Sequence, residues 1–136
     1  MLHAIHENEF VTDTMGPILW LERRKMPKNA KAIFAAAEQA RSVIHIPGIV
    51  FAEVLYLSEK RRIQLSLSEL ADWLQQHSYC REAVLDCRVI EVASVITDIP
   101  ELHDRLIAAT AKSLSLPLIT NDPVIQQSRF VQTIWQ

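Results

Sequence analysis

The sequence predicts an α/β protein, a three-layer α/β/α sandwich around a central parallel sheet of four to five strands. Three observations predict it: short β-branched runs alternate with helical patterns, only 2 of 136 residues are glycine, and neither an internal repeat nor a low-complexity tract is found. Few glycines argue against a turn-rich all-β fold, and strands separated by helices imply βαβ units. We expect one domain, 1–136, with a loose tail at 1–8.

The first half of the chain is predicted to contain two strands and three helices. Residues 10–12 form a short apolar strand, and Pro17 then opens a helix, since proline is tolerated in the first helical turn. Residues 30–40 carry apolar side chains on one helical face. The β-branched run 43–46 is the second strand, and Pro47 opens the third helix.

The second half continues this alternation. Ser66 and Glu69 have the spacing of a capping box, which predicts a helix start, and Asp86 is predicted to cap a helix after a short strand at 83–85. Residues 104–114, rich in Ala and Leu, are the most helix-like stretch. A buried strand at 117–120, a helix start at Asp122-Pro123 and a last strand at 130–135 complete the predicted sheet.

Composition narrows the class of protein. Hydrophobic residues make up 49% and charged residues 22%, as in ordinary soluble proteins, and no apolar run approaches the roughly 18 residues of a membrane helix. The first residues lack the pattern of a signal peptide, and Cys80 and Cys87 suggest neither a disulfide framework nor a zinc site. We therefore expect a cytoplasmic protein without membrane contact.

Basic residues gather in two clusters although the formal net charge is -2. A nucleic-acid enzyme usually needs an excess of Lys and Arg, so the distribution of charge matters more than the total. Two solvated helix ends are the plain alternative. The clusters are Arg23, Arg24, Lys25, Lys28 and Lys31, and Lys60, Arg61 and Arg62; of these we take Arg23, Arg24, Lys60, Arg61 and Arg62 as weak candidates for substrate contact.

Four acids follow predicted strands or begin predicted helices in a way that places them at one edge of the sheet. Ligands of parallel sheets bind beyond the carboxyl ends of the strands. Asp13 and Asp122 each follow a strand, Asp104 begins the Ala-rich helix, and Glu53 lies inside an apolar helical run where a charge is costly unless paired. Helix capping by Asp122, and a salt bridge from Glu53 to Arg105, are the structural alternatives.

Clustered carboxylates point to a hard cation. Two unit charges about 4 Å apart repel by on the order of 4 kcal/mol at an effective dielectric of 20, so a cation must offset the cluster. Oxygen ligands without Cys or His favour Mg2+ or Mn2+, whose natural chemistry is phosphodiester cleavage. His3 and His6 offer a weaker alternative, a zinc site in the tail, and His103 is either a substrate contact or an ordinary helix-end residue.

Two sequence blocks resemble the PIN-domain family, especially the VapC-type toxins of bacterial toxin-antitoxin systems. His103-Asp104-Arg105-Leu106-Ile107-Ala108-Ala109-Thr110-Ala111 and Leu118-Ile119-Thr120-Asn121-Asp122 look like its "DRLIAATA" and "T-x-D" blocks, and Asp13-Thr14 stands at the end of the first strand. The resemblance implies that Asp13, Glu53 and Asp104 are core metal ligands, that Asp122 is a more variable fourth acid, and that Thr14, Thr120 and Arg105 support the site.

The same resemblance implies a function and partners. It implies a Mg2+- or Mn2+-dependent endoribonuclease that acts on RNA, forms a homodimer and binds a VapB-type antitoxin. The chain departs from the family at Met15-Gly16-Pro17, which places the local geometry beside Asp13 in question. It departs again at Asp98-Ile99-Pro100, which makes Asp98 and Glu101 candidates for a minor role, either as metal ligands or as residues that hold the ligands.

Two alternatives stay open. One is a catalytically inactive, metal-free PIN-like domain that binds protein or RNA and in which the acids only cap helices. The other is a metal-dependent phosphatase, although the Asp-x-Asp pair of one common class is missing because Thr14 and Met15 follow Asp13.

Overall fold

The computed structural model describes residues 8–136. Its centre is a five-stranded sheet in the order β3-β2-β1-β4-β5, and every pairing in it is parallel. The strands are Glu9–Thr12 (β1), Val43–Pro47 (β2), Cys80–Ala83 (β3), Leu118–Ile119 (β4) and Thr133–Ile134 (β5). The predicted α/β class and the parallel sheet are confirmed.

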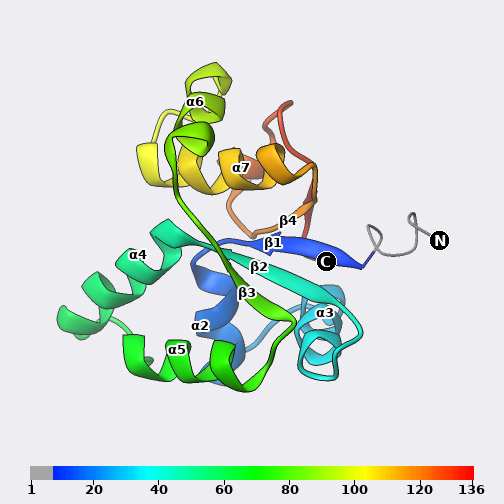
Figure 1. Ribbon diagram of the computed structural model, residues 1–136, viewed down its shortest axis with the longest axis vertical. Coiled ribbons are helices and arrows are strands. Elements are labelled where there is room, and N and C mark those ends of the chain that lie inside the picture. Colours follow the sequence, from blue (N-terminus) through cyan, green and yellow to red (C-terminus); the bar gives the residue numbers. More distant parts are fainter. Residues whose placement is uncertain (1–7) are drawn as a thin grey trace.

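Helices cover both faces of this sheet. They are Met15–Leu21 (α2), Lys28–Glu38 (α3), Gly48–Glu59 (α4), Leu67–Gln76 (α5), Cys87–Val95 (α6), Leu102–Leu114 (α7) and Pro123–Gln126 (α8). In Figure 1, α6 and α7 lie on one side of the sheet, and α2, α3 and α5 lie on the other. Over residues 8–136, none of these helices combines the length and the apolar character that crossing a membrane requires.

Side-chain caps fix the helix starts that the sequence indicated. The Ser66 hydroxyl accepts a hydrogen bond from the Glu69 amide at 3.0 Å, and the Ser66 amide donates to Glu69 Oε1 at 2.9 Å. Together these two bonds make a complete capping box. Asp86 caps α6 through the Val89 amide. Such caps satisfy amides that have no partner within the helix.

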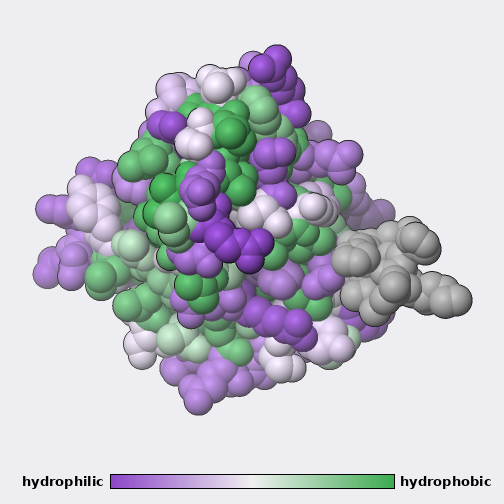
Figure 2. All heavy atoms as spheres, turned by 45° about the horizontal axis from the view of Figure 1, so that its top comes forward, coloured by the Kyte–Doolittle hydropathy of each residue, from purple (hydrophilic) through white to green (hydrophobic). Residues whose placement is uncertain are grey.

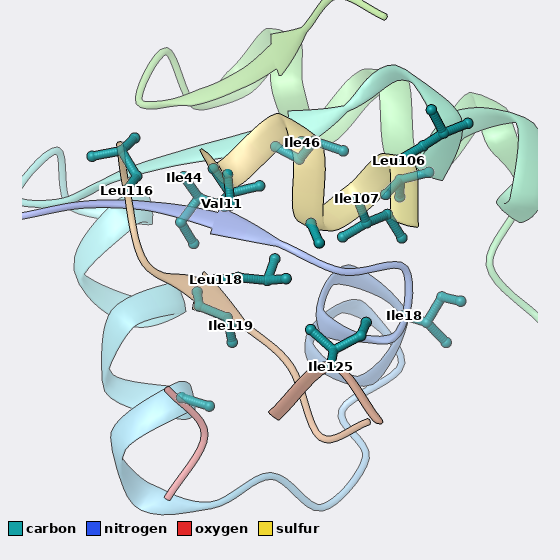
Figure 3. Packing of buried hydrophobic residues seen from close by; sticks show 14 of the residues in the cluster. Val11, Ile18, Ile44, Ile46, Leu106, Ile107, Leu116, Leu118, Ile119 and Ile125 are labelled. Atoms are coloured by element: carbon teal, nitrogen blue, oxygen red, sulfur yellow. The ribbon is translucent and has the colours of Figure 1, made fainter. Parts of the chain in front are cut away.

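The core lies around the three inner strands. Val11, Ile44 and Leu118 are fully buried, and Figure 3 shows them packed beside Ile107 of α7. Central strands of a parallel sheet are covered on both faces, so their sequences are continuously apolar. This property made β1, β2 and β4 recognisable in the sequence.

The prediction was wrong at one edge strand and too long at the other. The third strand is Cys80–Ala83 and not 83–85, and the last one is Thr133–Ile134 and not 130–135. β3 pairs with β2 alone, so its exposed Arg81 and Glu82 face solvent and the strand lacks an apolar pattern.

The N-terminal predictions lie largely outside the described part. The loose tail expected at 1–8, apart from Asn8, and the alternative zinc site at His3 and His6 fall outside residues 8–136. The carbonyl of Asn8 accepts the Val43 amide at 2.8 Å.

An aromatic stack joins the helices on the face of α2, α3 and α5. The ring of Phe34 lies 5.9 Å from that of Trp20 and 6.1 Å from that of Trp73, between ring centroids. Both indole N–H groups donate to Glu38 Oε2 at 2.8 Å. One carboxylate oxygen thus accepts from two partly buried donors, and the stack supplies apolar contact between three helices.

We expect Phe34→Ala to destabilise the protein strongly, because Phe34 is fully buried and its removal leaves a cavity between two indole rings. The free energy of unfolding should fall by about 3–5 kcal/mol, as measured by urea denaturation. Leu55→Ala is the control, since Leu55 is 43% exposed and should cost well under about 1 kcal/mol. Equal effects of the two substitutions would contradict the packing described.

Candidate active site

A cavity of about 830 Å³ opens beyond the carboxyl ends of β1 and β4. All four acids predicted from the sequence line it: Asp13, Glu53, Asp104 and Asp122. They come from four separate segments, namely the β1–α2 junction, α4, the first turn of α7 and the N-cap of α8. The fold therefore gathers carboxylates that lie up to 109 residues apart in the sequence, from 13 to 122.

Asp13 is held rigidly in the floor of the cavity. Its side chain is buried, Oδ1 accepts the Gly16 amide at 2.9 Å, and Oδ2 accepts the Thr120 hydroxyl at 2.8 Å. Thr120 Oγ1 in turn accepts the Asp122 amide at 3.1 Å. β1 pairs with β4 so that Thr12 lies opposite Ile119, which brings the next residue of each strand together. The Met15-Gly16-Pro17 segment thus helps to position the acid and does not displace it.

Glu53 is hydrogen-bonded to a neutral side chain, that of Thr14, and not to Arg105. Its Oε1 accepts the hydroxyl of Thr14, which also lines the cavity. No ion pair joins Glu53 to Arg105, both of which belong to the described part of the chain, and Arg105 Nε is buried without a hydrogen-bond partner. The salt-bridge alternative is therefore wrong, and Glu53 remains an acid at the cavity wall.

Asp104 and Asp122 stand at two helix starts. Glu101 is the N-cap of α7: its Oε1 accepts the Asp104 amide at 2.8 Å, and its Oε2 lies 2.8 Å from Nδ1 of His103. Asp122 caps α8, since its Oδ1 accepts the amides of Val124 and Ile125 at 2.8 and 3.1 Å. Asp122 combines the cap that was its structural alternative with a place at the cavity.

Burial and mutual repulsion raise the pKa of two of the acids. Desolvation raises the pKa of Asp13 from 3.8 to about 6, against the hydrogen bonds from Thr120 and Gly16. The pKa of Asp104 rises to about 6 through desolvation and then through the charges of Asp122, Glu101, Glu53 and Asp13. Without a cation, the cluster resists carrying its full negative charge near neutral pH.

Several predicted residues lie elsewhere. Thr120 donates to Asp13 and does not itself line the cavity. Arg105, Arg23 and the 60–62 cluster do not line the cavity either. Asp98 binds the Ser128 hydroxyl and the Arg129 amide at 2.8 and 2.9 Å, contacts that lower its pKa, and so it holds a loop. Asp98 ties this loop and does not line the cavity, whereas Glu101 accepts the amide of Asp104 at the start of α7. A minor role for the two, as metal ligands or as residues that hold the ligands, stays a prediction.

The structure also adds residues that the sequence reasoning did not select. Lys25, Asn121 and Trp135 line the cavity, and Gly16 holds Asp13. The spacing Asp13-x-x-Gly16, with the acid three residues before an early helical amide, is the signal of a capping contact that could have identified Gly16. Asn121 stood beside a selected acid, but nothing in the sequence pattern marked Trp135.

The donors around the cavity fit a hydrated hard cation by their chemistry. They are carboxylates, the Thr14 hydroxyl and the Asn121 amide, a set that matches the oxygen preference of Mg2+ and Mn2+. Over residues 8–136, no three acidic, histidine or cysteine side chains converge closely enough to hold one ion as they stand. A small ion that keeps several of its waters needs few direct protein ligands, so the donor set remains suitable.

Fold and site together define an α/β/α protein with an acidic cavity at the carboxyl edge of a parallel sheet. The family model of the PIN domain matches residues 11–130. The chain belongs to the PIN-domain family. No curated protein matches the sequence significantly.

Solved structures share this fold at low sequence identity. A chain of VapBC2 from Rickettsia felis, bound to a promoter DNA fragment, aligns with a TM-score of 0.71 and 17% identity over 94% of this chain and 99% of that one. DNA-bound VapBC from Salmonella typhimurium aligns with a TM-score of 0.67 and 19% identity, over 93% of this chain and 96% of that one. FitAcB from Neisseria gonorrhoeae aligns with a TM-score of 0.64 and 21% identity, over 92% of this chain and 96% of that one.

We expect Gly16→Ala to disturb the site through sterics. A Cβ at this position would lie 2.1 Å from Thr12 Oγ1 and 3.0 Å from Phe34 Cζ, and both neighbours are buried. Relief of the clash displaces the amide that binds Asp13, and stability should fall by about 1–3 kcal/mol in urea denaturation. Gly48→Ala is the comparison, because its nearest contacts are 3.2 Å and it should cost less than half as much. A neutral Gly16→Ala would contradict the geometry.

The raised pKa of Asp13 predicts an unusual pH dependence of stability in metal-free buffer. In the folded protein Asp13 keeps its proton up to about pH 6, whereas in the unfolded chain it loses the proton near pH 3.8. Asp13 therefore does not lower the free energy of unfolding below pH 3.8, and it lowers that free energy by its full amount above pH 6. Asp13→Asn should therefore be more stable than the parent at pH 7, by on the order of 1–3 kcal/mol, with the difference vanishing near pH 4. Asp72→Asn, on exposed α5 surface, should show no such difference across a urea-denaturation series.

Proposed function

We propose that this protein is a divalent-metal-dependent endoribonuclease that hydrolyses RNA phosphodiester bonds as the toxin of a VapBC-type pair. The observation that carries the proposal is the convergence of Asp13, Glu53, Asp104 and Asp122 on one cavity. An arrangement that raises the pKa of two acids to about 6 works against folding, which is expected where a function requires it. Membership of the PIN-domain family supports the same activity.

The side chains have separable roles in the proposed reaction. Asp13, Glu53, Asp104 and Asp122 would hold Mg2+ or Mn2+ directly or through waters. Thr120 and Gly16 fix both oxygens of Asp13, and Thr14 fixes Glu53. When bound, the metal supplies a lowered pKa for an attacking water and neutralises charge on the scissile phosphate. The water oxygen would attack phosphorus in line and give up a proton. The bond from phosphorus to the leaving ribose oxygen would break, and that oxygen would take up a proton.

Partners follow from the same proposal. Two solved structures that share the fold are named VapBC2 and VapBC, and a third, from Klebsiella pneumoniae, is named a toxin-antitoxin complex, which supports a VapB-type antitoxin as partner. A homodimer is supported by apolar surface around α6 and α7, which Figure 2 shows interrupted by polar side chains. The large exposed apolar side chains in and beside these helices are Val84, Ile90, Val95, Leu102 and Leu114. Such a toxin would act on RNA in the cytoplasm.

An inactive PIN-like binding module is the competing proposal. It is favoured by one observation: although the four acids share the cavity, no three Asp, Glu, His or Cys side chains within residues 8–136 lie close enough together to hold one ion. Calorimetry with Mn2+ separates the two proposals. An active nuclease should bind Mn2+ and gain thermal stability from it, and the absence of both effects would favour the binding module.

We expect Asp13→Asn and Asp104→Asn each to reduce Mn2+-dependent RNA cleavage by at least about 100-fold while the protein stays folded, since each removes a charged metal ligand. Asp72→Asn is the matched control, because it changes an exposed aspartate remote from the cavity. Cleavage is measured on total cellular RNA by sequencing new RNA ends. Full activity in both variants would sink the site assignment.

A further inference from the structure

We propose that Arg24 and Lys25 form a phosphate subsite that binds the RNA nucleotide next to the scissile phosphate, with Glu22 as the residue that positions Arg24. This inference rests on the proposed ribonuclease function and deepens it. It assigns two residues of the first basic cluster, Arg24 and Lys25, to the substrate and excludes the second cluster, Lys60, Arg61 and Arg62.

Side chains of both charges line the cavity. Among the described residues that line it, four are acids and only Arg24 and Lys25 are cationic. Apolar side chains, including Leu19, Met26 and Leu57, lie on the wall as well. A bound cation offsets the acids at one phosphate, but RNA carries a negative charge at every nucleotide, so the adjacent phosphate needs a separate cationic contact. Arg24 and Lys25 are the side chains in the cavity that can make it.

The end of α2 directs these residues toward the cavity. The chain leaves the helix through Arg23 in the left-handed conformation, with φ of 56°, and the Arg24 amide donates to the Leu19 carbonyl at 2.8 Å. This closing turn is typical of helix C-termini. It fixes the backbone of Arg24 and Lys25, which both line the cavity. Arg24 also lines a neighbouring pocket, and Arg23 lines that neighbouring pocket without lining the cavity.

Glu22 connects this turn to the loop before α5. Its Oε2 accepts the amides of Gln64 and Leu65 at 2.7 and 2.8 Å, and its Oε1 lies 3.5 Å from Nη1 of Arg24. The carboxylate is largely buried at 12% exposure, whereas the Arg24 side chain is 49% exposed. Glu22 thus anchors one guanidinium nitrogen loosely, and the planar fork of Arg offers further donors to a phosphate.

The second basic cluster provides a matched comparison. Lys60 and Arg62 are exposed, follow α4 and do not line the cavity, and the Lys60 ammonium lies 5.6 Å from the Tyr56 ring centre. Their removal changes the net charge as much as removal of Arg24 and Lys25 does. General attraction of RNA to positive charge would make the two pairs equivalent, whereas a subsite makes them different.

The test measures binding of a fluorescently labelled, random-sequence single-stranded RNA to the full chain in Mg2+, in a cleavage-deficient Asp104→Asn background. We expect Arg24→Gln with Lys25→Gln to lower affinity roughly tenfold and to reduce the slope of log affinity against log salt by about 0.7, the value for one lost phosphate contact on a single strand. Lys60→Gln with Arg62→Gln should leave the slope nearly unchanged. The charge-preserving exchange Arg24→Lys with Lys25→Arg should restore most of it.

The outcomes separate the subsite from the function itself. Equal slopes for the two Gln pairs, or no RNA binding by the parent background, would overturn the subsite. If the Arg24→Gln, Lys25→Gln variant binds Mn2+ more tightly and its salt slope is unchanged, Arg24 and Lys25 only offset the charge of the acids. This result would also overturn the subsite. Failure of the unmodified protein to cleave RNA with Mg2+ or Mn2+ would instead remove the proposed function, because the binding comparison does not depend on cleavage.

Discussion

The register between β1 and β4 is the constraint on which the site depends. Parallel pairing sets Thr12 opposite Ile119, and the Asp13 amide continues the ladder by donating to the Ile119 carbonyl at 3.1 Å. Asp13 and Thr120 therefore leave the two strands side by side. A shift of one residue would turn Thr120 to the opposite face, because side chains alternate along a strand. The buried hydroxyl-carboxylate contact and the apolar packing of these strands thus require the same register.

The cavity combines this rigid floor with charges that oppose folding. Asp13 is buried, and acids from α4, from α7 and from the N-cap of α8 line the same cavity. Hydrogen bonds to Asp13 from Thr120 and Gly16 partly offset its desolvation, as the directions of their effects on its pKa indicate. The remaining repulsion must be balanced by the apolar core and by the aromatic stack between α2, α3 and α5. A bound cation would remove this conflict and pre-organise the acids.

Sequence patterns predicted the fold best where burial on both faces left a strong signal. β1, β2 and β4 are apolar because helices cover both sides, and the caps at Ser66, Asp86 and Asp122 use side chains whose local chemistry is specific. β3 was misplaced because an edge strand is defined by backbone hydrogen bonds to one neighbour, and its side chains face solvent. Hydrogen bonding of this kind leaves little trace in residue type.

The sequence by itself determined that the four acids would meet, because each belongs to a segment whose end lies at the same edge of a parallel sheet. Tertiary structure alone decided which other residues join them. Arg105, adjacent to Asp104 in sequence, lies away from the cavity, since neighbouring helical residues point about 100° apart. Lys25 and Trp135 reach it from opposite ends of the chain. Such contacts depend on how helices pack and loops close, which local residue patterns do not encode.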